Sequence, residues 1–197
     1  TVTARQAFTP IRGAAFEGGK MLLGLFVSGN AVTVWDEEGW WVMECAGLCL
    51  NGGVGDTEVE GKVRVANGEK IKRVSAMAVL TESGRCFERV GLTPLNHKTP
   101  IIDIDSEYVL DKEGIWQIHN GDKLRLLAVC AVPGFEPQSL HILNADKRLF
   151  AVGFCDGHEY KLVVCHVDAS SGHAETTNLG NVTSAFVDLS RSTHYAL

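Results

Sequence analysis

Apolar residues occur in short runs along the chain, and turn-forming residues separate one run from the next. Runs of this kind, rich in Val, Leu and aromatic side chains, are typical of β-strands, and helical spacing is nowhere sustained over three turns. The pattern therefore predicts an all-β, mainly antiparallel protein. The expected strands are Lys20 to Val27, Ala31 to Asp36, Trp40 to Cys45, Val59 to Val65, Lys72 to Leu80, Cys86 to Val90, Gly114 to Ile118, Lys123 to Val132, Leu140 to Leu143, Arg148 to Phe154, Tyr160 to Val167 and Thr183 to Leu189.

The strand rhythm is interrupted once, between Pro94 and Pro100. About a dozen strands on the two sides of this interruption suit two antiparallel six-stranded β-barrels. We therefore expect an N-terminal barrel over residues 1–97 and a C-terminal barrel over residues 98–190. Residues 191–197 would be a tail or the start of a linker.

A β-propeller fragment is an alternative architecture. The first expected strands resemble one blade of a WD repeat, including the pair Trp35-Asp36. The segment Val54 to Pro100 does not repeat that pattern, whereas a repeat should persist at a fixed period, and four blades would leave an unclosed ring with exposed edges. In this alternative the chain would act as an interaction scaffold. The blade-like segments are Ile11 to Phe16, Lys20 to Val27, Ala31 to Asp36 and Trp40 to Cys45.

Composition narrows the classes of partner. The chain has 197 residues, of which 45% are hydrophobic and 21% charged, with a formal net charge of −6. This length can bury a proper core, and the negative balance gives no basic footprint for a nucleic-acid backbone. No apolar run is long enough to span a membrane, and no basic segment precedes an apolar stretch at the N-terminus, so we expect no membrane insertion. Because the chain begins with Thr1, we expect a proteolytic product or an excised fragment.

Six cysteines are present, and most lie within apolar runs such as Leu126 to Cys130. Free cysteine in such a run behaves as a small hydrophobic residue. We therefore expect reduced thiols in an intracellular protein.

The most informative segment for chemistry is Gly153-Phe154-Cys155-Asp156-Gly157. A cysteine flanked by glycines lets the backbone approach a scissile carbonyl, so that nearby N–H groups can stabilise an oxyanion. A buried cysteine before an ordinary hairpin turn explains the same letters, and for an isolated motif that simpler explanation is preferred.

The surroundings of Cys155 resemble the chymotrypsin-like main proteases (3C-like cysteine proteases) of nidoviruses, the coronavirus group included. The resemblance implies a two-barrel endopeptidase that cuts a replicase polyprotein after glutamine. It is looser in the N-terminal part, through Arg5-Gln6-Ala7-Phe8 and Glu17-Gly18. The motifs that carry it are Lys98-Thr99-Pro100, Gly121-Asp122-Lys123 with the apolar run to Cys130, Gly153-Phe154-Cys155, Cys165-His166, Gly172-His173-Ala174 and Phe186-Val187-Asp188.

Carried over by position, the resemblance makes Cys155 the nucleophile and assigns the oxyanion hole to the N–H groups of Gly153 and Cys155. Aligning Cys49 with the cysteine that follows the general-base histidine in the family puts Ala46 at the base position. No histidine precedes His97, so the chain as written lacks its base and is expected to be inactive. Ala46 is either an engineered replacement or the mark of a natural inactive relative that acts as a binding module.

The resemblance also implies a substrate-binding surface. His166 would lie at the base of the S1 pocket, where a neutral imidazole can bind the amide of a glutamine side chain. His173 would support the wall of that pocket. The substrate would lie as an extended strand against Val167, Asp168 and the residues up to Ser171.

The chain departs from the family in further places. Asp156 stands where glycine is usual, and its carboxylate would raise the pKa of a neighbouring thiol unless it points away. The position of a third, acidic triad member holds Val74 or Ser75, which predicts a Cys–His dyad.

We expect no metal and no cofactor. The set Cys155, His158, Cys165 and His166 could be imagined as zinc ligands, but its spacing is atypical. The implied partners are a polyprotein or peptide substrate and a second copy in a homodimer. The implied location is the host-cell cytoplasm, with viral replication membranes as a further site.

Overall fold

The computed structural model describes residues 21–28, 31–45, 57–59, 62–65, 68–119, 123–168, 171 and 173–182, and the described residues form an all-β structure. The prediction of an all-β, antiparallel protein is confirmed. The strands are β1 (Gly24–Ser28), β2 (Ala31–Trp35), β3 (Trp40–Cys45), β4 (Thr57–Val59), β5 (Ile71–Val74), β6 (Ala78–Thr81), β7 (Cys86–Glu88), β8 (Asp103–Asp105), β9 (Tyr108–Leu110), β10 (Gly114–His119), β11 (Lys123–Val129), β12 (Glu136–Asn144), β13 (Leu149–Cys155), β14 (Tyr160–Val167) and β15 (Ala174–Val182).

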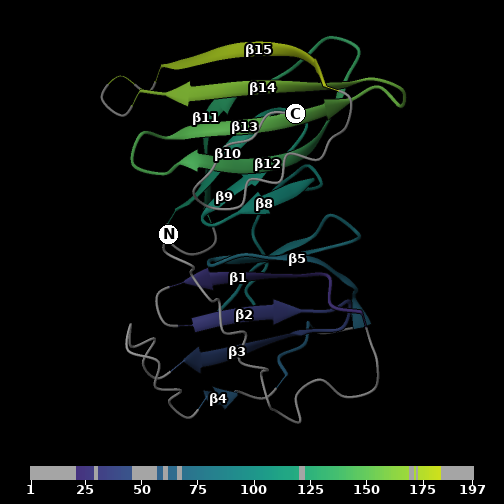
Figure 1. The fold of residues 1–197 in the computed structure, drawn as a ribbon, viewed down its shortest axis with the longest axis vertical. Coiled ribbons are helices and arrows are strands. Elements are labelled where there is room, and N and C mark those ends of the chain that lie inside the picture. The colour runs from purple at the N-terminus through teal and green to yellow at the C-terminus, as the bar shows by residue number, and fades with distance from the viewer. Residues whose placement is uncertain are drawn as a thin grey trace, which may run out of the picture. The chain divides into compact units, whose positions relative to one another are not determined.

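The strands form four antiparallel sheets in which each strand pairs with the next one along the chain (Figure 1). The first sheet contains β1 to β4, the second β5 to β7, the third β8 to β11 and the fourth β12 to β15. Among the described residues every sheet is open and none closes into a barrel, so the expected six-stranded barrels are not confirmed.

The chain divides into two compact units, Thr1–Arg64 and Val65–Leu197. The first unit holds the first sheet, and the second unit holds the other three. The expected junction between residues 97 and 98 falls inside the second unit, and it stays a prediction.

The third sheet lies between the other two sheets of the second unit, and its strand β9 is apolar on both faces. In β9 the side chain of Val109 belongs to a core shared with the second sheet, whereas Tyr108 and Leu110 belong to a core shared with the fourth. Successive side chains of a strand point to opposite faces, so a strand covered on both sides has no polar positions. This explains why Tyr108, Val109 and Leu110 are all buried.

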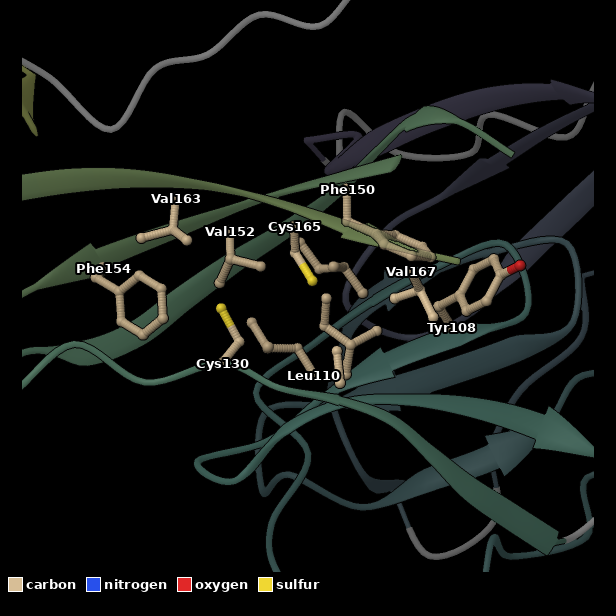
Figure 2. Packing of buried hydrophobic residues seen from close by; sticks show 12 residues of the cluster. Tyr108, Leu110, Cys130, Phe150, Val152, Phe154, Val163, Cys165 and Val167 are labelled. Atoms are coloured by element: carbon tan, nitrogen blue, oxygen red, sulfur yellow. The ribbon is translucent and has the colours of Figure 1, made fainter. Parts of the chain in front are cut away.

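The larger of the two cores lies between the third and fourth sheets. Figure 2 shows the side chains of Phe150, Val152 and Phe154 of β13 packed in one core with those of Leu110 and Cys130. Tyr108 meets the ring of Phe150 edge to face, with centroids 4.8 Å apart. Alternate residues of β13 are large and apolar, and they bury this side of the fourth sheet.

The first strands of the three sheets in the second unit lie next to one another: β8 contacts β5, and β12 contacts β8. Asp103 of β8 connects all three. Its carboxylate pairs with Arg73 of β5 at 2.7 Å and accepts the backbone N–H of Leu140 in β12 at 2.8 Å. Asp105 makes a second link by accepting the N–H of Ile142 at 2.9 Å. These carboxylates occupy the hydrogen-bonding edge of β12, which would otherwise be an unpaired strand edge.

A turn of one kind follows the second strand in three of the sheets. Asp36, Asp111 and Asp156 each stand directly after that strand. The Oδ1 atom of each accepts the backbone N–H groups two and three positions further on, at 2.8 to 3.0 Å. Aspartate is favoured here because a short carboxylate can cap the turn amides. The pair Trp35-Asp36 is thus the first instance of a repeated turn.

Candidate functional site

Cys155 ends β13, opposite Tyr160 of β14 and Glu136 of β12. Its Sγ accepts the backbone N–H of Gly157 at 3.2 Å, and a hydrogen bond with Cys155 raises the pKa of the Tyr160 phenol. The polar neighbours of this thiol are therefore its own turn and a tyrosine.

Gly153 lies in the middle of β13, opposite Ser139 and Leu162. A Cβ atom at position 153 would come within 2.6 Å of the Ser139 hydroxyl oxygen. Since real Cβ contacts are longer, the Ser139 hydroxyl packs over position 153 and would have to rotate to admit a side chain there. A packing requirement is therefore enough to explain the first glycine of the motif.

The structure does not bring His166 to Cys155. In the β13–β14 pairing, Cys155 is opposite Tyr160, and His166 is opposite Leu149 at the other end of the hairpin. His166 lies six positions beyond Tyr160 along β14, which at about 3.3 Å per residue is roughly 20 Å. The nucleophile and the specificity pocket of a protease contact the same residue of the substrate, so they must lie close together. Cys155 and His166 are too far apart for this.

The other predicted substrate-binding residues are engaged within the fourth sheet. Val167 is buried in the core, and its N–H donates to the carbonyl oxygen of Arg148 at 3.1 Å. The N–H of Asp168 donates to the carbonyl oxygen of His173 at 2.8 Å, and its carboxylate caps Ser171. His173 is exposed. Ala46, the position of the missing base, lies outside the described residues.

The carboxylate of Asp156 points into its own turn. Hydrogen bonds from the backbone N–H groups of Glu159 and His158 hold the pKa of Asp156 below its usual value. This aspartate serves the same turn as Asp36 and Asp111, which accounts for its presence beside a cysteine.

The described cysteines are expected to differ in reactivity. Burial raises the pKa of Cys86 and of Cys130 to about 12 and that of Cys165 to about 11, whereas Cys155 is half-buried at the end of a strand. Because the thiolate is the reactive form, iodoacetamide at neutral pH should alkylate Cys155 well before the three buried thiols. Peptide mapping by mass spectrometry measures this order, with the protein in guanidinium as the control in which all react. Equal labelling of Cys86 and Cys155 in the native protein would contradict the expectation.

A denser polar cluster surrounds the buried carboxylate of Asp111. Besides the two turn amides, Oδ1 accepts the indole N–H of Trp116 at 2.9 Å. Oδ2 bonds to Nε2 of His97 at 2.7 Å and to the hydroxyl of Thr99. The His97 and Trp116 rings meet edge to face, with centroids 4.7 Å apart. We call these four side chains the Asp111 network.

Charge is retained on Asp111 despite its burial. Burial alone would raise the pKa of this carboxyl, but hydrogen bonds from Thr99, His97 and Trp116 outweigh it and lower the pKa to about 2. The network fixes residues 97–99 against the turn between β9 and β10. It therefore holds the segment that connects the second sheet to the third.

A cavity of about 270 Å³ lies beside this connecting segment. Its lining comes from the β6–β7 turn on one side and from residues 94–101 on the other. We call it the connector cavity. Two backbone hydrogen bonds of 2.9 Å hold the segment at its ends, from Leu95 N–H to the Cys86 oxygen and from Ile101 N–H to the Gly84 oxygen.

Within the described ranges, no group of three or more His, Cys, Asp or Glu side chains could hold a metal ion. The same residues contain no helix of the length and apolarity needed to cross a membrane.

Comparison with known proteins gives little similarity. No family model matches the chain, and no curated protein matches it. Among solved structures, a chain from the S. cerevisiae complex of a Dbp5 variant bound to Nup159, a Gle1 variant, IP6 and ADP is similar, with 12% identity and a TM-score of 0.47. The match covers 80% of this chain and 47% of that chain, so this protein spans about half the length of its structural neighbour.

The expected membership of the nidovirus main proteases is wrong. The structural match is to a chain of the Dbp5 complex and not to a protease, and no protease family matches the sequence. The physical reason lies in the hairpin of β13 and β14, which separates the cysteine and histidine that the family would join. The short motifs around Cys155 have local explanations, namely a capped turn at Asp156 and the packing of Ser139 over Gly153.

Three polar residues of the second unit were missed by sequence reasoning: Asp103, Asp111 and, as a partner of Asp111, His97. A signal for Asp111 was present, because Leu110-Asp111 and Cys155-Asp156 repeat the position of Trp35-Asp36 after an apolar strand. This repeated strand–aspartate pattern was not recognised because its three instances are unevenly spaced along the chain.

Proposed function

We propose that the protein is an interaction scaffold in which the three successive antiparallel sheets of the second unit are arranged as blades of a propeller-like arc, and that its loops bind partner proteins. The order of strands within each sheet supports this, because each sheet is a simple meander, and in three of the four a capped turn follows the second strand. Repeated sheets with side-by-side first strands are the elements from which propellers are built.

The observation that carries the proposal is the bridge made by Asp103. One buried carboxylate joins the first strands of three successive sheets through an ion pair and a backbone hydrogen bond. Such a link fixes the sheets relative to one another within the second unit. Rigid sheets with fixed connecting loops present a surface whose binding costs little ordering entropy.

The proposal is tested by selection of phage-displayed random peptides on the full chain. We expect enriched peptides that bind saturably when synthesised, with a Kd below about 1 mM, and that are recovered intact. Heat-unfolded protein is the control bait, and peptides that bind it equally are discarded. The proposal fails if no peptide is enriched on the folded chain, or if mass spectrometry shows that the bound peptides are cleaved.

A further inference from the structure

The connector cavity is formed before any ligand arrives. Its segment is held at both ends by backbone hydrogen bonds to the second sheet, and in the middle by the bonds of His97 and Thr99 to Asp111 in the third sheet. Gly84, at the tip of the β6–β7 turn, has a φ of +80°, and a Cβ there would come within 2.8 Å of Pro100. The two walls are therefore in close contact, and binding requires little rearrangement.

The lining combines apolar surface with positive charge. Pro100 is exposed and supplies the apolar surface, whereas Leu95 and Ile101 belong to the core behind it, and Arg85 and Lys98 supply two cations. Arg85 is paired with Glu69, which also accepts the Ser83 hydroxyl at 3.0 Å. Lys98 is exposed and forms no ion pair with the described residues. One cation at the cavity is therefore available to a ligand.

The size of the cavity sets the size of the ligand. A volume of about 270 Å³ is close to that of nine liquid water molecules at roughly 30 Å³ each, and it falls just below the range of pockets for whole small molecules. It suits one or two side chains of a segment that lies across the opening.

The net charge of the protein also bears on which ligand the cavity can bind. The chain carries a formal charge of −6, so most of its surface repels an acidic partner. Lys98 is then a local exception to this negative charge, and it attracts a carboxylate of the ligand. The apolar part of the lining can contact an apolar side chain next to that carboxylate.

We infer that the connector cavity binds an acidic, extended segment of a partner protein, with a carboxylate beside Lys98 and a neighbouring apolar side chain against Pro100. The inference rests on the proposed scaffold function and names the chemistry of one of its partners.

The test uses three fluorescein-labelled pentapeptides of fixed sequence: Gly-Glu-Leu-Glu-Gly, its Gln-for-Glu amide analogue and its Lys-for-Glu analogue. Fluorescence anisotropy with the full chain should show saturable binding of the acidic peptide, with the other two at least about tenfold weaker, a difference of about 1.4 kcal/mol. The binding should weaken as salt is raised, because an exposed charge pair is screened.

Variants locate the binding. Lys98→Glu should reduce binding of the acidic peptide at least about tenfold, whereas Lys98→Arg should retain it. Lys147→Glu is the matched control, since Lys147 is also exposed but lies in the β12–β13 turn of the fourth sheet. Lys98 is exposed and has no ion pair with the described part of the chain to lose, so its variants should keep the native far-UV circular dichroism.

The possible results of these experiments distinguish a failure of the cavity assignment from a failure of the scaffold function. Equal binding of the acidic and amide peptides, or an unchanged affinity in Lys98→Glu, overturns the inference. If the phage-selected peptides still bind, but protect loops outside residues 83–101 from hydrogen exchange, the scaffold function stands and the cavity assignment fails. If the selection enriches nothing, the scaffold function itself fails.

Discussion

Replacing Asp103 by alanine is expected to destabilise the second unit by about 3–5 kcal/mol, the usual cost of removing one partner of a buried ion pair. The side chain of Asp103 is 6% exposed and that of Arg73 is 27% exposed, so the guanidinium would be left largely buried without its counter-ion. The N–H of Leu140 would lose its acceptor at the same time. Urea unfolding followed by tryptophan fluorescence measures the effect.

Asp105→Ala is the matched control for Asp103. Asp105 lies two residues along the same strand and accepts the N–H of Ile142, but it takes part in no ion pair with another residue that the structure describes. Its loss should cost only about 1 kcal/mol, the net value of one hydrogen bond. Equal destabilisation by the two substitutions would show that the ion pair with Arg73 contributes nothing to the junction of the three sheets.

Replacing Asp111 by alanine is expected to cost about 3–4 kcal/mol, because hydrogen bonds to a charged group contribute more than neutral ones and several are lost together. The indole of Trp116 and the ring of His97 would lose their shared acceptor, and the turn would lose its cap. Thermal unfolding monitored by circular dichroism tests this. Asp156→Ala removes the same kind of cap from an exposed turn and should cost less than about 1 kcal/mol. A similar loss in both variants would contradict a special role of the Asp111 network.

The Asp111 network should also make stability depend on pH in the acid range. The pKa of Asp111 is lowered from 3.8 to about 2 in the folded protein, so the unfolded chain binds a proton more readily. Its contribution is therefore fully present above about pH 4 and is lost as the pH falls towards 2. The difference in unfolding free energy between wild type and Asp111→Asn should shrink over this range. A difference that stays constant from pH 5 to about pH 2 would mean that the carboxylate charge does not contribute.

The fold class was predictable because strand signals are local. Alternating apolar residues and glycine-containing turns mark β14 and the β1–β2 hairpin in the sequence as they lie in the structure. The run Lys72 to Leu80 was expected to be one strand, but it forms β5 and β6. The reason is Ser75, whose hydroxyl oxygen accepts the N–H of Ala78 and whose backbone N–H donates to the Ala78 carbonyl oxygen, closing a turn between the two strands.

The strand β8 escaped prediction for a different reason. Two aspartates within three residues disfavour a strand on intrinsic propensity. They are stable there because Asp103 binds Arg73 and both carboxylates cap N–H groups of β12, about thirty or more residues away in the chain. No local pattern contains these partners.

The candidate site, too, was predictable from the sequence only in part. The sequence singled out Cys155 as a candidate nucleophile, which stays a prediction, but its neighbours are decided by strand pairing, which places Tyr160 opposite it and His166 at the far end of the hairpin. The connector segment was noted only as a break in the strand rhythm. Its bonds to Asp111 and its cavity depend on two sheets packing together.

The sequence by itself determined that this protein is built from antiparallel strands and where several of its turns fall, because those properties depend on side-chain alternation and on residues within a few positions of each other. Only the tertiary structure decided how the strands group into four open sheets, that Asp103 joins three of them, and that the cysteine and histidine of the expected active site are apart. These features depend on which distant segments of the chain pair. Buried contacts between those segments stabilise one pairing over the others, and a linear pattern of residues does not specify these contacts.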